Sequence, residues 1–175
     1  MDNLLELMIN RRSVRKYSTE PVTDEQIKTI TTAALLGPSG HSKYPCEFIV
    51  VKDRETLEKM SHCRVAVAKM LNNASCAIVV IADKDKADTV IEDSAISMMN
   101  MHLMAANLGL GSCWIQLRIR EAEDSRSSEE YIRELLGIPQ NYLCQAILSI
   151  GNLEKAPKPH DVNKLHFDKI HSEKF

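Results

Sequence analysis

The strongest constraint on the fold is the segment Ser75–Ala82, which reads SCAIVVIA and contains no charged residue. A β-strand turns successive side chains to opposite faces, so a strand that is apolar throughout must be covered on both sides. This segment therefore predicts the central strand of a sheet that is packed between two layers of helices.

The rest of the chain alternates strand-like and helix-like segments around that central strand. Strands are predicted at 46–52, 75–82, 113–117 and 142–150, and helices at 2–9, 23–36, 55–60, 64–71, 88–108 and 127–137. Thr23 and Gln26 form a capping box, and Ser127 caps a later helix. No linker or repeat divides the 175 residues, which suits a single domain, 1–175. We expect an α+β fold, a three-layer α/β/α sandwich with a central mixed sheet.

Composition excludes several classes of partner. The chain has 22 basic and 24 acidic residues, and its net charge of −2 gives no reason to expect nucleic acid or an anionic membrane. No apolar run is long enough to span a membrane, and the first ten residues lack a signal peptide's basic segment. Five cysteines without a Cys-x-x-Cys pair indicate free thiols in a reducing compartment. We therefore expect a cytoplasmic protein without a metal site.

The small net charge conceals an uneven distribution. Residues 11–16 (RRSVRK), called the basic hexad below, carry +4, and residues 155–175 carry +2, which leaves −8 on the remainder. One interpretation is a solvated loop at a helix end, where cations also complement the helix dipole. The other is an anion site, because Arg offers bidentate contacts to phosphate and Ser13 adds a hydroxyl.

Other candidate motifs fail on their context. Gly109-Leu-Gly111 lacks the third glycine of a dinucleotide fingerprint and follows a helix, so it predicts a glycine helix end. Residues 40–43, GHSK, lack the spacing of a Walker A loop, and no G-x-S-x-G elbow is present. The methionine-rich stretch 98–104 and His102 within it fit a core or a subunit interface.

Several segments, taken together and in order, resemble the nitroreductase family of flavin enzymes. They are RRSVR at 11–15, GPSG at 37–40 with Pro45, GLGSCWIQ at 109–116, LGIP at 136–139, and the stretch from Ala146 through Pro-Lys-Pro at 157–159. The resemblance covers nearly the whole chain. It implies an intertwined homodimer with FMN at both subunit interfaces, and a C-terminal arm, 155–175, that packs on the partner subunit.

The resemblance also implies a set of cofactor contacts. The phosphate and ribityl chain would contact Arg11, Arg12 and Ser13, with Lys158 and His160 from the tail. The pyrimidine end would contact Arg15, as the electrostatic stabiliser of reduced flavin. The partner subunit would supply Pro38, Ser39, Gly40 and Ser42. The isoalloxazine would be lined by Trp114, Ile115 and Gln116, with a backbone N–H near N5.

Some positions depart from the family pattern. The family's Asn-x-Gln-Pro-Trp is replaced by Ser42-Lys-Tyr-Pro-Cys46, and His160 stands where an Arg is common. Lys69 is close to a family Lys but out of register. The chain is also compact, which predicts an open pocket and a broad range of acceptors.

The implied activity is hydride transfer through flavin N5, which requires no nucleophile from the protein. We expect ping-pong turnover in which NADH or NADPH donates and a small-molecule oxidant, a nitroaromatic, quinone or flavin, accepts. Two alternatives stay open: a flavin-binding carrier or sensor without turnover, and a flavin-free protein whose hexad is only a solvated loop or docking patch. The sequence does not choose between NADH and NADPH.

Overall fold

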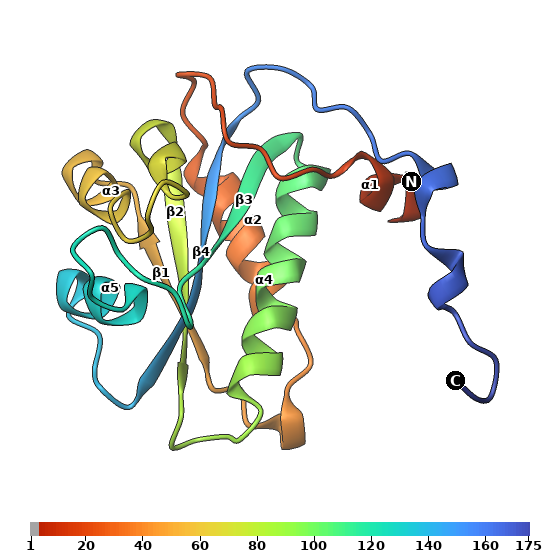
Figure 1. Ribbon diagram of the computed structural model, residues 1–175. Coiled ribbons are helices and arrows are strands. Elements are labelled where there is room, and N and C mark those ends of the chain that lie inside the picture. The colour runs from red at the N-terminus through yellow and green to blue at the C-terminus, as the bar shows by residue number, and fades with distance from the viewer. Residues whose placement is uncertain (1–3) are drawn as a thin grey trace.

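The computed structural model describes residues 4–175 and shows a sheet between helices (Figure 1). The strands are β1 (Cys46–Val51), β2 (Cys76–Asp83), β3 (Leu110–Gln116) and β4 (Tyr142–Asn152). The helices are α1 (Leu4–Asn10), α2 (Asp24–Leu35), α3 (Arg54–Met60), α4 (Val90–Asn107) and α5 (Ser128–Leu136). Single 3₁₀ turns occur at Gly40–Ser42, Lys69–Asn73, Val162–Lys164 and Phe167–Lys169. The predicted start of the first helix, at Asp2, lies outside the described residues.

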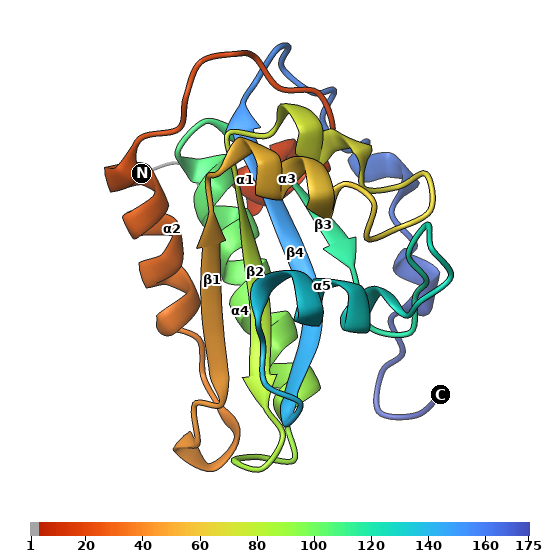
Figure 2. The same ribbon diagram turned by 90° about the vertical axis from the view of Figure 1, so that its left-hand side faces the viewer.

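The three-layer sandwich is confirmed. Helices α2 and α4 cover one face of the sheet, and α3 and α5 cover the other (Figure 2). In β2 the side chains of Ile78 and Val80 enter the core under α2 and α4, whereas Val79 and Ile81 enter the opposite core. The strand that is apolar on both faces is thus central. Within residues 4–175 no helix has the length and hydropathy that a bilayer crossing requires.

The expected mixed sheet is wrong for the four strands. They lie in the order β1-β2-β4-β3, and each neighbouring pair is antiparallel. β2 and β3 run in the same direction and are joined through α4, as in a parallel sheet. However, β4 lies between them and pairs antiparallel with both. The one parallel pairing among the described residues is an isolated bridge between Ser13 and Ser112.

Local sequence signals correctly predict several helix ends. The Thr23–Gln26 capping box forms, and Gly109 follows α4 with a φ of +74°. The helix predicted at 64–71 is wrong, because these residues form turns that lead into the 3₁₀ turn Lys69–Asn73. Ala66 lies in the left-handed region with a φ of +56°, between two exposed valines, and β-branched residues favour helices poorly.

Two glycines allow the basic hexad to pass close to the sheet. Gly111 of β3 and Gly151 of β4 are register partners. A Cβ on Gly111 would lie 2.8 Å from Val14 Cγ1, and one on Gly151 would lie 2.6 Å from Tyr17 Cγ. Tyr17 is buried, and its hydroxyl donates to the Val14 carbonyl at 2.9 Å. The glycine pair and this tyrosine therefore fix the path of residues 14–17.

We expect Gly151→Ala to destabilise the protein by about 3 kcal/mol, because the Tyr17 ring is buried and cannot move away from a new methyl group. Chemical denaturation measures the loss. Gly109→Ala is the control. An alanine at this position meets no atom within 4 Å and carries only the strain of a left-handed φ, so it should cost about 1 kcal/mol. Equal losses in the two variants would contradict the close packing.

Candidate cofactor site

The basic hexad and the C-terminal tail meet at one end of the sheet. After α1, the Val14 N–H donates to the Ser112 carbonyl at the start of β3, at 2.9 Å. The tail returns along α1, where the His160 N–H donates to the Ile9 carbonyl at 2.9 Å (Figure 1). Arg12 Nη1 donates to the Lys158 carbonyl at 2.8 Å, which joins the two segments directly.

A cavity of about 480 Å³ lies between these segments. Its lining residues are Arg11, Arg12, Ser13, Arg15, Pro157, Lys158 and His160. Every ionisable side chain among them is basic, which suits an anion such as a phosphate ester. The structure thus brings together all the residues that the sequence predicted around the phosphate. Arg12 also holds the tail, through its hydrogen bond to the Lys158 carbonyl.

Arg11 is supported from behind by a buried histidine. His102 of α4 is 3% exposed, and its Nε2 lies 3.5 Å from Arg11 Nη1. Its Nδ1 lies 2.6 Å from the Ser112 hydroxyl. Burial, followed by the nearby Arg11 charge, lowers the pKa of His102 to about 4. His102 is therefore neutral at pH 7, and sequence reasoning assigned it only to a core or interface.

The open edge of β3 continues from the hexad. β3 is the edge strand of the described sheet, and in an antiparallel strand alternate residues turn both backbone groups outward. The Ser112 carbonyl accepts from Val14, and the Gln116 carbonyl accepts from Arg64 at 3.0 Å, so both face outward. By the same alternation, the N–H groups of Trp114 and Gln116 point to this edge.

The three residues that were expected to line an isoalloxazine are therefore not equivalent. Ile115 is fully buried, and its side chain belongs to the core cluster on the α3 and α5 side of the sheet. Trp114 and Gln116 are half-buried and joined by a 2.8 Å hydrogen bond from Trp114 Nε1 to Gln116 Oε1. The period of a strand explains why only two of three consecutive residues are available.

The charge of Arg15 acts on Cys113 of β3. Burial raises the pKa of the Cys113 thiol, against the opposing effects of the Arg15 charge and the Ser13 hydroxyl. Ser13 is also paired with Ser112 of β3 through an isolated bridge. Cys113 itself is 1% exposed, which argues against a role as a nucleophile.

Arg64 bounds the far end of the β3 edge. It comes from the turn region that sequence analysis assigned to a helix, and no local motif marks it. Lys69, which the family pattern suggested, is held by Glu123, with 2.8 Å between Lys69 Nζ and Glu123 Oε1. His62 Nδ1 lies 2.6 Å from the other carboxylate oxygen of Glu123. Lys69 is thus part of an ion-pair cluster in this structure.

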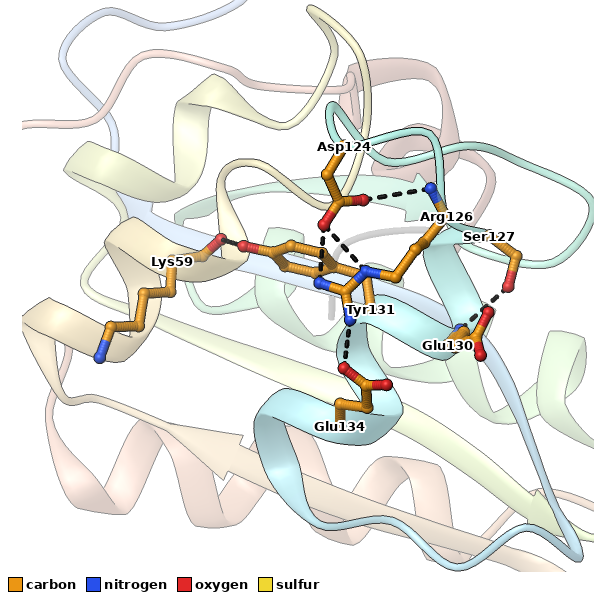
Figure 3. Close-up of polar contacts among 7 residues, drawn as sticks. All are labelled: Lys59, Asp124, Arg126, Ser127, Glu130, Tyr131 and Glu134. Carbon is orange, nitrogen blue, oxygen red and sulfur yellow. Dashed lines mark hydrogen bonds and ion pairs between the residues drawn. The ribbon is translucent and has the colours of Figure 1, made fainter.

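The loop after β3 is anchored by an arginine network (Figure 3). Arg126 contacts Asp124 at 2.6 Å and Glu134, and its guanidinium lies 5.0 Å above the centre of the Tyr131 ring. The Tyr131 hydroxyl donates to the Lys59 carbonyl at 2.8 Å. These contacts tie the loop to α5 and α3, and so keep the far end of the β3 edge in place.

The remaining predicted residues lie near the opposite end of helix α4. Asp93, in the first turns of α4, is 4% exposed and accepts from the Ser39 hydroxyl at 2.5 Å and the Gly40 N–H at 3.2 Å. His102, which contacts the hexad, is nine residues further along α4, a rise of about 14 Å. Pro38, Ser39, Gly40 and Ser42 are therefore not brought to the cavity within one chain (Figure 1).

Comparison with known proteins adds independent information. A sequence profile described as "Nitroreductase family" matches residues 8–67 and 64–152. An Archaeoglobus fulgidus protein, provisionally named NADH dehydrogenase/NAD(P)H nitroreductase, is 38% identical over 180 residues, covering 100% of both chains. A Vibrio harveyi NADPH-flavin oxidoreductase is 26% identical over 173 residues, covering 90% of this chain and 69% of its own. The structure of an FMN-dependent nitroreductase from Clostridium difficile R20291 superposes with a TM-score of 0.94 at 42% identity, covering 98% of this chain and 99% of that one.

Proposed function

The chain belongs to the nitroreductase family, and on that premise we propose that it is an FMN-dependent oxidoreductase whose electron donor is NADH or NADPH. The observation that carries the proposal is the all-basic cavity between the hexad and the tail, whose lining residue Ser13 pairs with Ser112 of β3. A phosphate fits the basic cavity, and a planar ring system that accepts hydrogen bonds fits the outward N–H groups of β3. Relatives named as FMN-dependent and NADPH-dependent flavin enzymes support it.

The residues present suit FMN. Arg11, Arg12 and Ser13 would hold the phosphate, and the edge donors of Trp114 and Gln116 would meet polar atoms of the ring. Bound FMN supplies a hydride acceptor at N5, so no protein nucleophile is required. Arg15 would place a cation beside the pyrimidine end, where it stabilises the negative charge that develops on reduction.

We propose that the site is completed by a second copy of the chain. Loop 37–45 carries the other expected contacts but lies about 14 Å along α4 from the hexad, so it would serve the partner's site. Large apolar side chains are exposed where a partner is needed: Leu4 and Leu5 of α1 are 58% and 61% exposed, and Phe167 and Ile170 of the tail are 65% and 74% exposed. The arm 155–175 would pack on the partner and cover such surfaces.

The donor and the oxidant would use the same exposed flavin face in turn, in ping-pong fashion. The acceptors proposed are nitroaromatics, quinones and free flavin, because the chain has no long insertion to close the pocket. The five cysteines are free, and four of them are buried, which fits the reducing cytoplasm that we propose as its compartment. A flavin carrier or sensor without turnover remains the second candidate, favoured by Ser42 and Cys46 in the partner loop.

The visible absorption spectrum of the purified protein tests the function. We expect a flavin spectrum that bleaches within seconds when NADH or NADPH is added without oxygen, and that returns with a nitroaromatic or quinone. A flavin spectrum that neither donor bleaches would support the carrier or sensor. A colourless protein that takes up no FMN would contradict both.

We expect Arg15→Ala to slow flavin reduction by at least about tenfold while FMN is largely retained, because the developing negative charge loses its cation. Stopped-flow bleaching at saturating NADH measures the rate. Lys16→Ala is the matched control: it removes an adjacent exposed cation that does not line the cavity, and should change the rate by less than about twofold. An Arg15→Ala enzyme as fast as the wild type would show that Arg15 does not act on the flavin.

A further inference from the structure

His102 is the one histidine of the described chain that is buried, and both of its ring nitrogens have partners. It lies on the buried side of α4, in the apolar stretch between Met98 and Ala105. Burying a polar ring in a core costs free energy unless its hydrogen bonds are satisfied. His102 meets that cost with Ser112 on one side and Arg11 on the other.

The partners fix the protonation of the ring. Arg11 can only donate, so His102 Nε2 must carry the lone pair and accept. Nδ1 then carries the hydrogen and donates to the Ser112 hydroxyl, 2.6 Å away. Hydrogen-bond donation thus runs in one direction along this relay, from Arg11 through the neutral His102 ring to Ser112, in agreement with the lowered pKa of His102.

The relay links a flexible side chain to two rigid elements. Arg11 belongs to an irregular segment, whereas His102 and Ser112 belong to α4 and β3. Arg11 also lines the basic cavity. A free arginine loses much rotamer entropy when it binds an anion, and prior positioning removes part of that loss from the binding step.

We propose that His102 is a positioning residue that holds the Arg11 guanidinium, through the Ser112–His102–Arg11 relay, for the phosphate of the cofactor. The proposal rests on the proposed function, because it concerns the same phosphate site. It adds a residue that does not touch the cofactor. A residue with this role should change the affinity for the phosphate and not the affinity for the flavin ring. A purely structural histidine would not produce that difference.

The test compares two ligands that differ by the phosphate. FMN is removed from the purified dimer, and FMN and riboflavin are titrated into wild type, His102→Leu and His102→Gln. We expect His102→Leu to raise the Kd for FMN about threefold to tenfold and to leave the Kd for riboflavin unchanged. His102→Gln should restore FMN affinity, since its amide oxygen can accept from Arg11 and its amide nitrogen can donate to Ser112.

Two controls separate positioning from folding. Met101→Leu changes the buried neighbour of His102 at similar volume and should leave both affinities unchanged. In an Arg11→Ala background, His102→Leu should cause no further loss, because the relay then has nothing to position. If His102→Leu does not fold, Ser112→Ala tests the same relay from its other end, and it should weaken FMN binding without affecting riboflavin.

The outcomes distinguish this inference from the function beneath it. Wild type that binds FMN, with a His102→Leu variant of equal affinity or with equal losses for both flavins, would overturn the positioning role alone. Wild type that binds neither flavin would overturn the proposed function and the positioning role with it.

Discussion

Arg11→Ala is expected to raise the Kd for FMN about 10- to 100-fold and to leave the Kd for riboflavin within about twofold. The change removes charge-assisted hydrogen bonds to the phosphate, which are worth roughly 1.5–3 kcal/mol. The loss should exceed that of His102→Leu, because the contacting group itself is removed. Flavin fluorescence during titration of the cofactor-free protein measures both constants.

Arg118→Ala is a suitable control for total charge. Arg118 is a half-buried arginine beyond the end of β3 and does not line the basic cavity. It should leave both constants nearly unchanged. If Arg11→Ala weakened FMN and riboflavin equally, the phosphate would have to be bound elsewhere.

A mixed dimer should recover cofactor binding from two defective chains. One chain would carry Arg11→Ala and Arg12→Ala, which remove two cations that line the basic cavity. The other would carry Gly40→Val, because a Cβ on Gly40 would lie 2.4 Å from Thr89 Oγ1, so that the loop or Thr89 must shift. If the hexad and the loop of one site come from different chains, each mixed dimer contains one intact and one doubly defective site.

We therefore expect both pure variants to hold almost no FMN, and the mixed dimer, purified with two different tags, to hold about one FMN where wild type holds two. The flavin absorbance per dimer is the measurement. A mixed dimer as empty as its parents would mean that each site is built within a single chain. Re-pairing two hexad variants with different tags controls for the effect of the exchange procedure and should remain empty.

Sequence patterns predicted the layers of the fold because the relevant signals are local. The apolar segment that became β2, the Thr23 capping box and Gly109 each depend on neighbours within a few residues. The antiparallel sheet could not be predicted in the same way. It depends on β4 lying between β2 and β3, a pairing between strands that are far apart in the chain.

The candidate site shows the same division. The basic residues of the hexad and the tail could be recognised as a cluster of charge, and the family pattern placed them together. The partnership of Arg11 with His102 could not be predicted, since 91 residues separate them and a histidine in an apolar helix fits a core equally well. The period of a strand could have excluded Ile115 once the register of β3 was known.

The open edge of β3 has a consequence for the solubility of the protein. An unpaired strand edge offers a row of backbone groups to which another sheet can add, and this is a common route to aggregation. Here the edge is occupied at one end by Val14 and at the other by Arg64, which leaves only a short stretch around Trp114. A bound cofactor would fill that stretch. A cofactor bound at this edge would thus also prevent the β3 edges of two molecules from pairing. Loss of the cofactor would expose the edge again.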